Sequence, residues 1–251
     1  MKVQVFIPCF IDQLYPQTAF NMIKVLEKAC CDVEYNTNQT CCGQPAFNAG
    51  FWDEAKSVAT KFIKDFETTD YIVAPSASCV GFVRNYYGKF FENSSQHNLI
   101  KNLSGRIFEF TEFLTKVLKI ENFGAILNAK ATYHDSCAAL RECKIKEGPR
   151  SLLAKVKGLE LIEMPDTETC CGFGGTFAVK FDAISYAMAD QKINHALSTG
   201  ASHIVSTDIS CLMHLQGIIT KRSIPLTTMH IADVLASGWE GDQYLQRRCL
   251  Q

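Results

Sequence analysis

The sequence of 251 residues has little net charge and no long run of apolar residues. Its formal charge of -1 and pI near 6.6 create no overall positive field that would attract nucleic acid or an anionic membrane. No segment approaches the roughly 18 uninterrupted apolar residues of a membrane-spanning helix. We therefore expect neither a nucleic-acid partner nor a membrane-spanning segment.

The amino-terminal residues do not have the pattern of an export signal. The first residues, MKVQVFIPCFIDQ, carry one lysine and an apolar run that Pro8 interrupts, which predicts a first strand in place of a signal peptide. The expected location is the cytoplasm, where disulfides are rare. The 12 cysteines are therefore expected to be reduced thiols that are available to metal.

Common nucleotide and ferredoxin motifs are missing as well. GFGGTF at 172–177 ends in Phe177, where the dinucleotide fingerprint requires glycine. The chain has no phosphate-binding loop with glycine, lysine and serine, and no ferredoxin run of cysteines at two-residue gaps. We expect no flavin or nicotinamide site.

What the sequence does contain is a repeated pattern of cysteines. QTCCGQP at 39–45 and ETCCGFG at 168–174 each hold two adjacent cysteines followed by glycine, and each pair lies between two single cysteines. Every cysteine of the first set recurs 128 to 132 residues later. This spacing predicts an internal duplication with a boundary near Gly124, giving domains at 1–124 and 125–251 that are related by a rough two-fold axis.

The segments between the cysteines alternate between strand and helix patterns. Apolar or β-branched runs such as VQVFIPC, YIVAPSASC, KATYHDSC and HIVSTDISC each end in a cysteine. Amphipathic patterns at 17–30, 52–66 and 182–198 predict helices, and further helices are expected at 109–119 and 230–236. The alternation predicts two tandem α/β domains with parallel sheets, whose cysteine loops lie at the carboxyl ends of the strands.

Adjacent cysteines discriminate between two kinds of metal site. Zinc sites usually space paired cysteines roughly two to four residues apart, so that both sulfurs reach one tetrahedral ion. An iron-sulfur cluster is larger, and neighbouring thiolates can bind different irons of it. The adjacent pairs therefore favour a cluster, with a zinc-stabilised binding module as the alternative. The glycine after each pair lets the backbone approach the cluster and donate an N–H to sulfur.

These motifs resemble the duplicated cysteine-rich (CCG) domain family, which includes the cysteine-rich subunit of heterodisulfide reductase and the glycolate oxidase iron-sulfur subunit. CCGQPAFNAG, CCGFGGTFAVK, SCLMH and MHIADVL are most similar to the lactate utilization protein A branch. The resemblance covers nearly the whole chain. It implies an oxidoreductase subunit of a complex that oxidises L-lactate to pyruvate together with partner iron-sulfur and accessory subunits. It also implies that eight cysteines bind two iron-sulfur clusters: Cys9, Cys41, Cys42, Cys79, Cys137, Cys170, Cys171 and Cys211.

One departure from the wider family affects the predicted chemistry. Phe82 and His214 stand where that family has one more cysteine in each half. Four thiolates per half suit one [4Fe-4S] cluster, so electron transfer is the preferred hypothesis and cleavage of a heterodisulfide is the alternative. The chain is expected to be inactive alone, because no complete site for a carboxylate substrate is recognisable.

Other polar residues near the motifs have alternative interpretations. His214 is either an iron ligand or a polar helix residue, and His134 with Asp135 either moves protons or caps the next helix. Lys180 either holds a carboxylate or is a solvated lysine. Cys30, Cys31 and Cys143 are interpreted as packing residues, and Cys249 as a thiol of the tail. The basic region at 141–157 either docks an acidic partner or is a solvated face.

Overall fold

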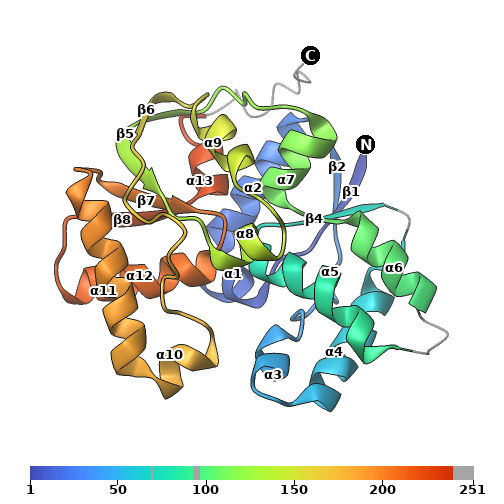
Figure 1. The fold of residues 1–251 in the computed structure, drawn as a ribbon. Helices are drawn as coiled ribbons and strands as arrows, with labels where there is room; N and C mark the ends of the chain where they lie inside the picture. The colour runs from blue at the N-terminus through green and yellow to red at the C-terminus, as the bar shows by residue number, and fades with distance from the viewer. Residues whose placement is uncertain (69, 93–96, 240–251) are drawn as a thin grey trace.

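The computed structural model describes residues 1–68, 70–92 and 97–239, which form two parallel sheets (Figure 1). The first sheet has the order β2-β1-β3-β4 and the second β6-β5-β7-β8, and every strand pairing in both is parallel. The strands are β1 (Lys2–Val5), β2 (Asp32–Tyr35), β3 (Tyr71–Ala74), β4 (Ile107–Glu109), β5 (Ile126–Tyr133), β6 (Lys157–Leu161), β7 (His203–Ser206) and β8 (Thr227–His230). The predicted architecture of two tandem α/β units is confirmed, while the boundary near Gly124 stays a prediction.

Helices connect the strands in nearly the same order in the two halves. Those of the first half are α1 (Cys9–Leu14), α2 (Pro16–Lys28), α3 (Gln44–Asn48), α4 (Trp52–Asp65), α5 (Ala77–Phe90), α6 (His97–Arg106), α7 (Phe110–Glu112) and the π-helical segment η1 (Phe113–Leu118). Those of the second half are α8 (Cys137–Arg141), α9 (Glu147–Leu153), α10 (Thr176–Lys180), α11 (Asp182–Ser198), α12 (Ile209–Lys221) and α13 (Ile231–Leu235). In the described part of the chain, no helix is both long and apolar enough to span a membrane.

The helix expected at 109–119 starts one residue later, at Phe110, and becomes π-helical from Phe113 onward. Glu109 ends β4, and its buried side chain accepts hydrogen bonds from the backbone N–H groups of Thr111 and Glu112, so the helix begins only after it. Burial raises the pKa of Glu109 to about 8. After Glu112 the helix widens into η1, which ends at Leu118 and is followed by Lys119 with a φ of 57°. The apolar spacing indicated a helix but contained no signal for this change of hydrogen-bonding pattern.

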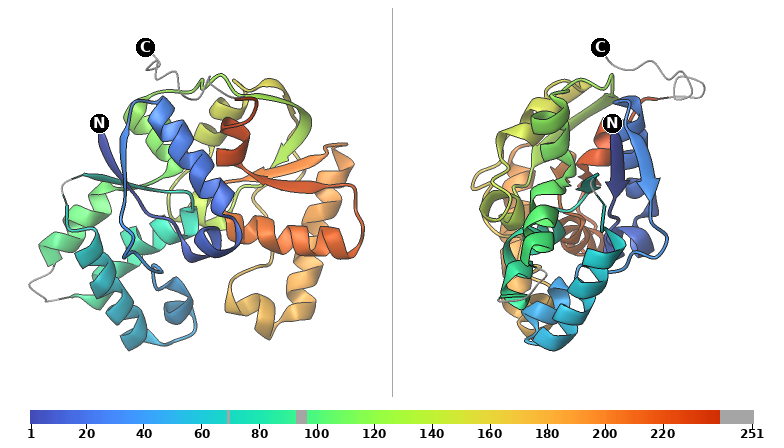
Figure 2. Two further views of the ribbon diagram at one scale, coloured as in Figure 1. Left: turned by 180° about the vertical axis from the view of Figure 1, so that it is seen from behind. Right: turned by 90° about the vertical axis from the view of Figure 1, so that its right-hand side faces the viewer.

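The two halves pack through pairs of helices that hold corresponding places in the two repeats. Helix α2 contacts α13, and its counterpart α9 contacts α7; likewise α1 contacts α12, and α8 contacts α5. Figure 2 shows α2 and α13 side by side. One cluster of buried apolar residues includes Val3 and Val73 of the first sheet together with Ile204 of the second. Hydrophobic burial therefore joins the halves into one unit.

Removal of the Asp233 carboxylate is expected to weaken this junction. Its two oxygens, on α13, accept hydrogen bonds of 2.9 Å from Thr18 Oγ1 and 2.8 Å from Asn21 Nδ2, both on α2. Asp233→Ala should lower the free energy of unfolding by about 1–3 kcal/mol, measured by urea denaturation. The matched control is Glu160→Ala, which removes an exposed ion pair with Lys130 and should cost less than about 0.5 kcal/mol. Equal losses in the two variants would contradict the prediction.

Candidate functional site

Single cysteines lie where strands of both sheets lead into helices. Helix α1 begins at Cys9 after β1, and α8 begins at Cys137 after β5. Cys79 and Cys211 lie in the first turns of α5 and α12, which follow β3 and β7. Because β1 pairs with β3 and β5 with β7, the carboxyl ends of these strands bring two cysteines to one edge of each sheet.

The two cysteine pairs lie in tight turns that glycine makes possible. Gly43 and Gly172 have φ values of 88° and 90°, in the left-handed region. Their backbone N–H groups donate to Cys41 Sγ at 3.3 Å and Cys170 Sγ at 3.4 Å. A Cβ atom on Gly172 would lie 2.5 Å from the carbonyl oxygen of Ser185 on α11. The turn is therefore pressed against the following helix, and a larger residue does not fit there.

The thiols of each half converge on one place. Cys42 Sγ lies 3.4 Å from Cys79 Sγ, and the Cys41 thiol forms hydrogen bonds with those of Cys9 and Cys42. In the second half, the Cys170 thiol bonds with those of Cys137 and Cys171, and Cys171 bonds with Cys211. In both halves the second cysteine of the adjacent pair is buried, and so is the cysteine in the first turn of α5 or α12. The other two cysteines of each half are half-buried. The structure thus brings together all four predicted cysteines of each half.

One thiol in each group is the most acidic. Hydrogen bonds from Cys42 and then Cys9 lower the pKa of Cys41, and hydrogen bonds from Cys137 and then Cys171 lower that of Cys170. The same bonds raise the pKa of their partners. Four sulfur donors in a partly buried place suit a soft metal centre, so the donor set fits metal or cluster binding.

The second group contains a histidine in addition to its cysteines. His134, between β5 and α8, is fully buried, and neither ring nitrogen makes a hydrogen bond of normal geometry. One nitrogen and the sulfurs of Cys171 and Cys211 all lie within 4.8 Å of one another. Burial is the main reason why the pKa of His134 falls to about 4, so the imidazole is neutral at pH 7. The structure therefore places this candidate from the sequence beside the thiols of the second half.

Lys180 and His214, the other two candidates from the sequence, have different surroundings. Lys180 is exposed at the end of α10 and has no hydrogen bond or ion pair with a described residue. His214, on α12, places Nε2 3.2 Å from Ser185 Oγ, which donates a 2.8 Å hydrogen bond to the carbonyl oxygen of Gly172. Burial lowers the pKa of His214. His214 thus supports the turn that carries the second cysteine pair.

Sequence reasoning missed Lys192, which is buried on α11. Its side chain is 1% exposed, and Nζ donates to the carbonyl oxygens of Asp166 at 2.6 Å and Thr167 at 3.1 Å. Burial lowers the pKa of Lys192, while Cys171 and Cys170 act in the opposite direction by attraction between charges. The helical period places Lys192 on the same face as Ala189 and Ala196, but this position alone does not show that the lysine is buried.

The remaining cysteines lie apart from these two groups or pack beside them. Cys31 is buried directly before β2, at the amino end of the first sheet. Cys30 is disulfide-bonded, so the expectation that every thiol is reduced is wrong for this residue. Cys143 is buried and donates to the carbonyl oxygen of Ala77 at 3.4 Å. Cys249 lies outside the described residues.

Two of the six basic residues at 141–157 are neutralised by contacts within the chain. Arg150 pairs with Asp135 and Glu163, each at 2.7 Å, and Lys146 pairs with Glu168 at 2.6 Å. These pairs leave less free positive charge than the sequence indicates.

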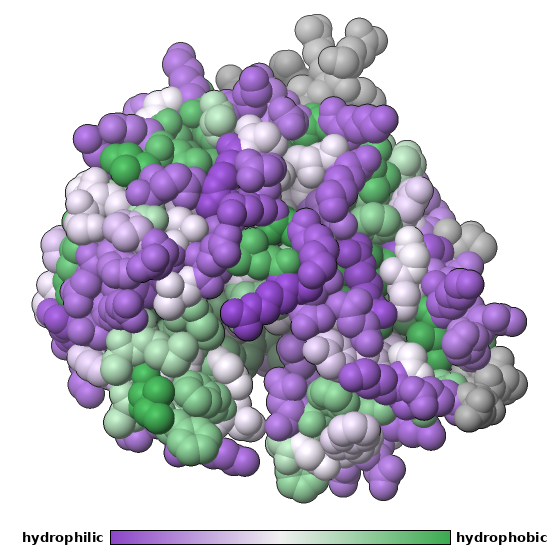
Figure 3. Space-filling model, in the orientation of Figure 1, coloured by the Kyte–Doolittle hydropathy of each residue, from purple (hydrophilic) through white to green (hydrophobic). Residues whose placement is uncertain are grey.

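Apolar side chains are exposed next to both cysteine turns. Phe51 and Trp52 follow α3, and Val179 and Phe181 lie at the end of α10, with exposed fractions between 52% and 84%. Figure 3 shows apolar surface over α10–α11 and over α3–α4, on either side of a hollow. Exposed apolar groups of this kind are typical of contact surfaces.

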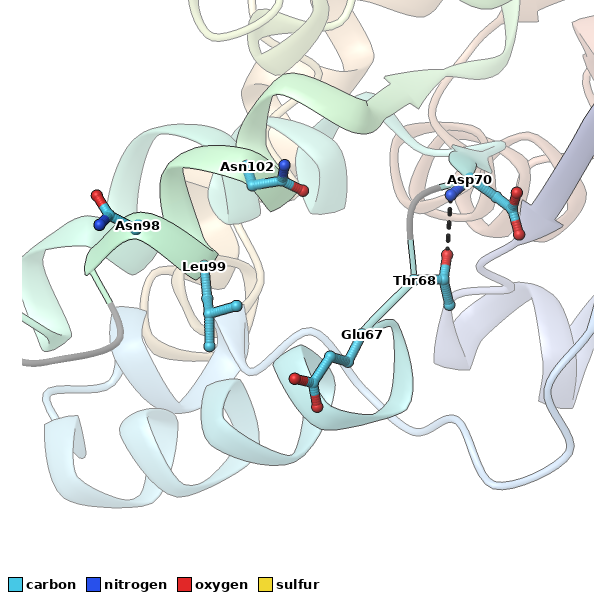
Figure 4. Close-up of a pocket in the computed structure, with 6 residues that line it drawn as sticks. All are labelled: Glu67, Thr68, Asp70, Asn98, Leu99 and Asn102. Carbon is cyan, nitrogen blue, oxygen red and sulfur yellow. Dashed lines mark hydrogen bonds between the residues drawn. The ribbon is translucent and has the colours of Figure 1, made fainter.

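A surface hollow of about 630 Å³ lies elsewhere, and no cysteine lines it (Figure 4). Its walls come from the segment after α4 and from α6, and comprise Glu67, Thr68, Asp70, Asn98, Leu99 and Asn102. The Asp70 N–H donates to Thr68 Oγ1 at 3.0 Å within it. It offers neither a thiol nor a buried charged group for chemistry.

Comparisons with known proteins agree with the duplicated arrangement. The model of the CCG cysteine-rich domain matches residues 3–84 and 131–216, which together contain all eight clustered cysteines. Lactate utilization protein A 1 of Bacillus mycoides is 42% identical over 236 residues, covering 94% of this chain and 96% of that protein. Lactate utilization protein A of a Geobacillus species is 41% identical over 237 residues, covering 94% of this chain and all of that protein.

Among solved structures, a hypothetical protein from Helicobacter pylori has the same fold, with a TM-score of 0.59 at 10% identity. The match covers 97% of this chain and 50% of that one. Both cysteine groups lie inside matched repeats, and the similarity to the curated relatives extends over nearly the full length. The chain therefore belongs to the family of proteins built from the duplicated CCG cysteine-rich domain.

Proposed function

We propose that this chain is an iron-sulfur electron-transfer subunit of a system that oxidises L-lactate to pyruvate. The residues that would hold one [4Fe-4S] cluster in each half are Cys9, Cys41, Cys42 and Cys79, and Cys137, Cys170, Cys171 and Cys211. When bound, each cluster supplies one-electron oxidation and reduction. The observation that carries the proposal is the convergence of adjacent cysteines with two further thiols, once in each half.

The residues around the thiols suit the control of a cluster. The N–H groups of Gly43 and Gly172 point to sulfur, where hydrogen bonds raise a reduction potential. Tyr87 donates a 2.8 Å hydrogen bond to the carbonyl oxygen of Cys42 and fixes the first turn. Phe6 and Phe62 are buried in the apolar cluster that also contains Cys42 and Cys79, so this side of the thiol group is apolar.

Contacts between the two sites support transfer of electrons through the chain. Phe10, which follows Cys9, packs edge-to-face on Phe173, which follows the second cysteine pair, with ring centroids 5.9 Å apart. Asp208 accepts hydrogen bonds from Ser78 N at 2.9 Å and Ser78 Oγ at 3.2 Å. Ser78 precedes Cys79, and Asp208 lies at the start of the helix that carries Cys211. The ligand segments of both sites are therefore in direct contact.

The names of the curated relatives support lactate as the substrate of the system. A lactate carboxylate needs a cation, and three of the arginines are already engaged. Arg84 pairs with Glu112, Arg106 donates to backbone carbonyl oxygens and Arg150 pairs with Asp135. Partner subunits that complete the substrate site would find apolar contact surface around Trp52 and Phe181.

Zinc is a second candidate for the second half alone. His134, Cys171 and Cys211 form a group of three donors that resembles part of a structural zinc site. His134 lies three residues before Cys137, and the equivalent position in the first half, three residues before Cys9, is Phe6. The first half therefore has no histidine at this place. Analysis of iron, zinc and labile sulfide in each half separates the two interpretations.

Serine substitution in either cysteine pair is expected to remove iron from its own half. Cys41→Ser or Cys171→Ser should lower iron and labile sulfide per folded chain to about half of the unsubstituted value, because serine oxygen is a poor ligand for cluster iron. The measurement is iron and sulfide analysis with electron paramagnetic resonance on protein purified under argon. Zinc without sulfide in the unsubstituted protein would disprove the cluster proposal.

The control variant is Cys143→Ser, which alters a buried thiol beside the same helices. Its iron and sulfide content should equal that of the unsubstituted chain, while the melting temperature falls because a hydroxyl replaces a buried thiol. Loss of iron in Cys143→Ser as complete as in Cys41→Ser would mean that the ligand set is assigned wrongly.

The chain alone is expected to oxidise L-lactate poorly, even with its clusters bound. The physical reason is that no base and free arginine meet near the thiols among the described residues. The measurement is reduction of an artificial electron acceptor by L-lactate under argon. Rapid turnover by the single chain would show that a complete substrate site exists on it.

A further inference from the structure

The two sites have the same sulfur ligands but different neighbours. In the first half, Phe6 and Phe62 pack edge-to-face with ring centroids 4.8 Å apart. Gly43 lies against Ala55 on α4, and in the same way Gly172 lies against Ser185 on α11. Seven residues after Ala55 stands Phe62, and seven residues after Ser185 stands Lys192. Lys192 therefore occupies the place of Phe62, and His134 occupies that of Phe6. An aromatic pair in one half corresponds to a polar, basic pair in the other.

Lys192 lies close enough to the second site to act on its charge. Its Nζ donates to the carbonyl oxygens of Asp166 and Thr167, in the segment that leads to Cys170. The charge of Lys192 lowers the pKa of His134, while Cys171 and Cys170 raise the pKa of Lys192. Because the lysine is buried, water screens its charge much less than that of a surface lysine. Its carbonyl partners from Asp166 and Thr167 are neutral, so they hold the ammonium group without cancelling its charge.

Acidic groups also lie near the second site, and the carboxylates of Asp135 and Asp166 raise the pKa of Lys192 and so favour its charged form. Asp135 is neutralised by its pairing with Arg150. Asp208 lies between the halves, where it accepts hydrogen bonds from Ser78 of the first and Ser210 of the second, and its charge raises the pKa of Cys137 in the second site. The main influences on the thiol pKa values of Cys9, Cys41 and Cys42 in the first half are the neighbouring thiols and burial.

We propose that Lys192 and His134 hold the reduction potential of the second site above that of the first, so that electrons within the chain move from the first site to the second. Reduction adds negative charge, which a buried cation and an N–H donor beside sulfur both stabilise. In each transfer the first site loses one electron and the second gains one, with no further oxidant or reductant. This inference rests on the proposed function, because it requires a cluster in both halves.

Single-site variants allow the two potentials to be measured separately. Cys41→Ser retains the second site and Cys171→Ser retains the first. Titration with dithionite under argon, followed by electron paramagnetic resonance, should give a higher midpoint potential for Cys41→Ser. We expect at least a tenfold difference in the reduction equilibrium, which is about 59 mV for one electron. Equal potentials, or a lower one for the second site, would overturn the proposal whether or not any Lys192 variant folds.

Variants of the second site test the cause of the difference. In the Cys41→Ser background, Lys192→Met should lower the midpoint potential, Lys192→Arg should retain it, and His134→Phe should lower it by a smaller amount. The control is Lys180→Met, which removes an exposed lysine near the same loop and should leave the potential unchanged. A shift for Lys192→Met no larger than that for Lys180→Met would overturn the assigned role of Lys192.

Iron analysis distinguishes failure of this inference from failure of the proposed function. If the unsubstituted chain contains no iron and sulfide, the proposed function is wrong and the inference falls with it. If both sites contain clusters but their potentials are equal or reversed, the proposed function is retained and only the inference is rejected. Circular dichroism and iron per folded chain show whether each variant retains its structure and cluster.

Discussion

The sharp turn after each cysteine pair is the constraint on which both sites depend. Gly43 and Gly172 adopt a backbone conformation that other residues rarely adopt, and each lies against the helix that follows. This turn directs two neighbouring thiols toward the cysteines at the starts of the helices after β1 and β3, or after β5 and β7. Without it, adjacent side chains would diverge and the four sulfurs would not meet.

Much of this arrangement was predictable because it repeats along the sequence. Equal spacing of the cysteines indicated the duplication, and the strand patterns placed Cys9, Cys79, Cys137 and Cys211 at the ends of strands. Amphipathic spacing indicated α2, α4 and α11 with small errors at their ends. These features are local or periodic, so one sequence contains enough information to predict them.

Features that depend on contacts between distant residues were not predictable in this way. The surroundings of His134 are set by Cys171 and Cys211, which lie far along the chain. Lys192 was missed because a lysine on an amphipathic helix is usually solvated, and only the packing of α11 shows that it is buried. The change to a π-helix after Glu112 and the paired helices between the halves also depend on packing, which periodicity does not specify.

The shared core of the two halves has a consequence for how such a protein can diversify. In a symmetric dimer of one small domain, every residue occurs in both sites, so a substitution changes the two centres together. Here the two domains are covalently joined and packed through one hydrophobic core, yet each position is encoded once. Phe6 and His134 can therefore differ at equivalent places. Because the two copies are joined in one chain, their sites can carry different residues and still remain in contact.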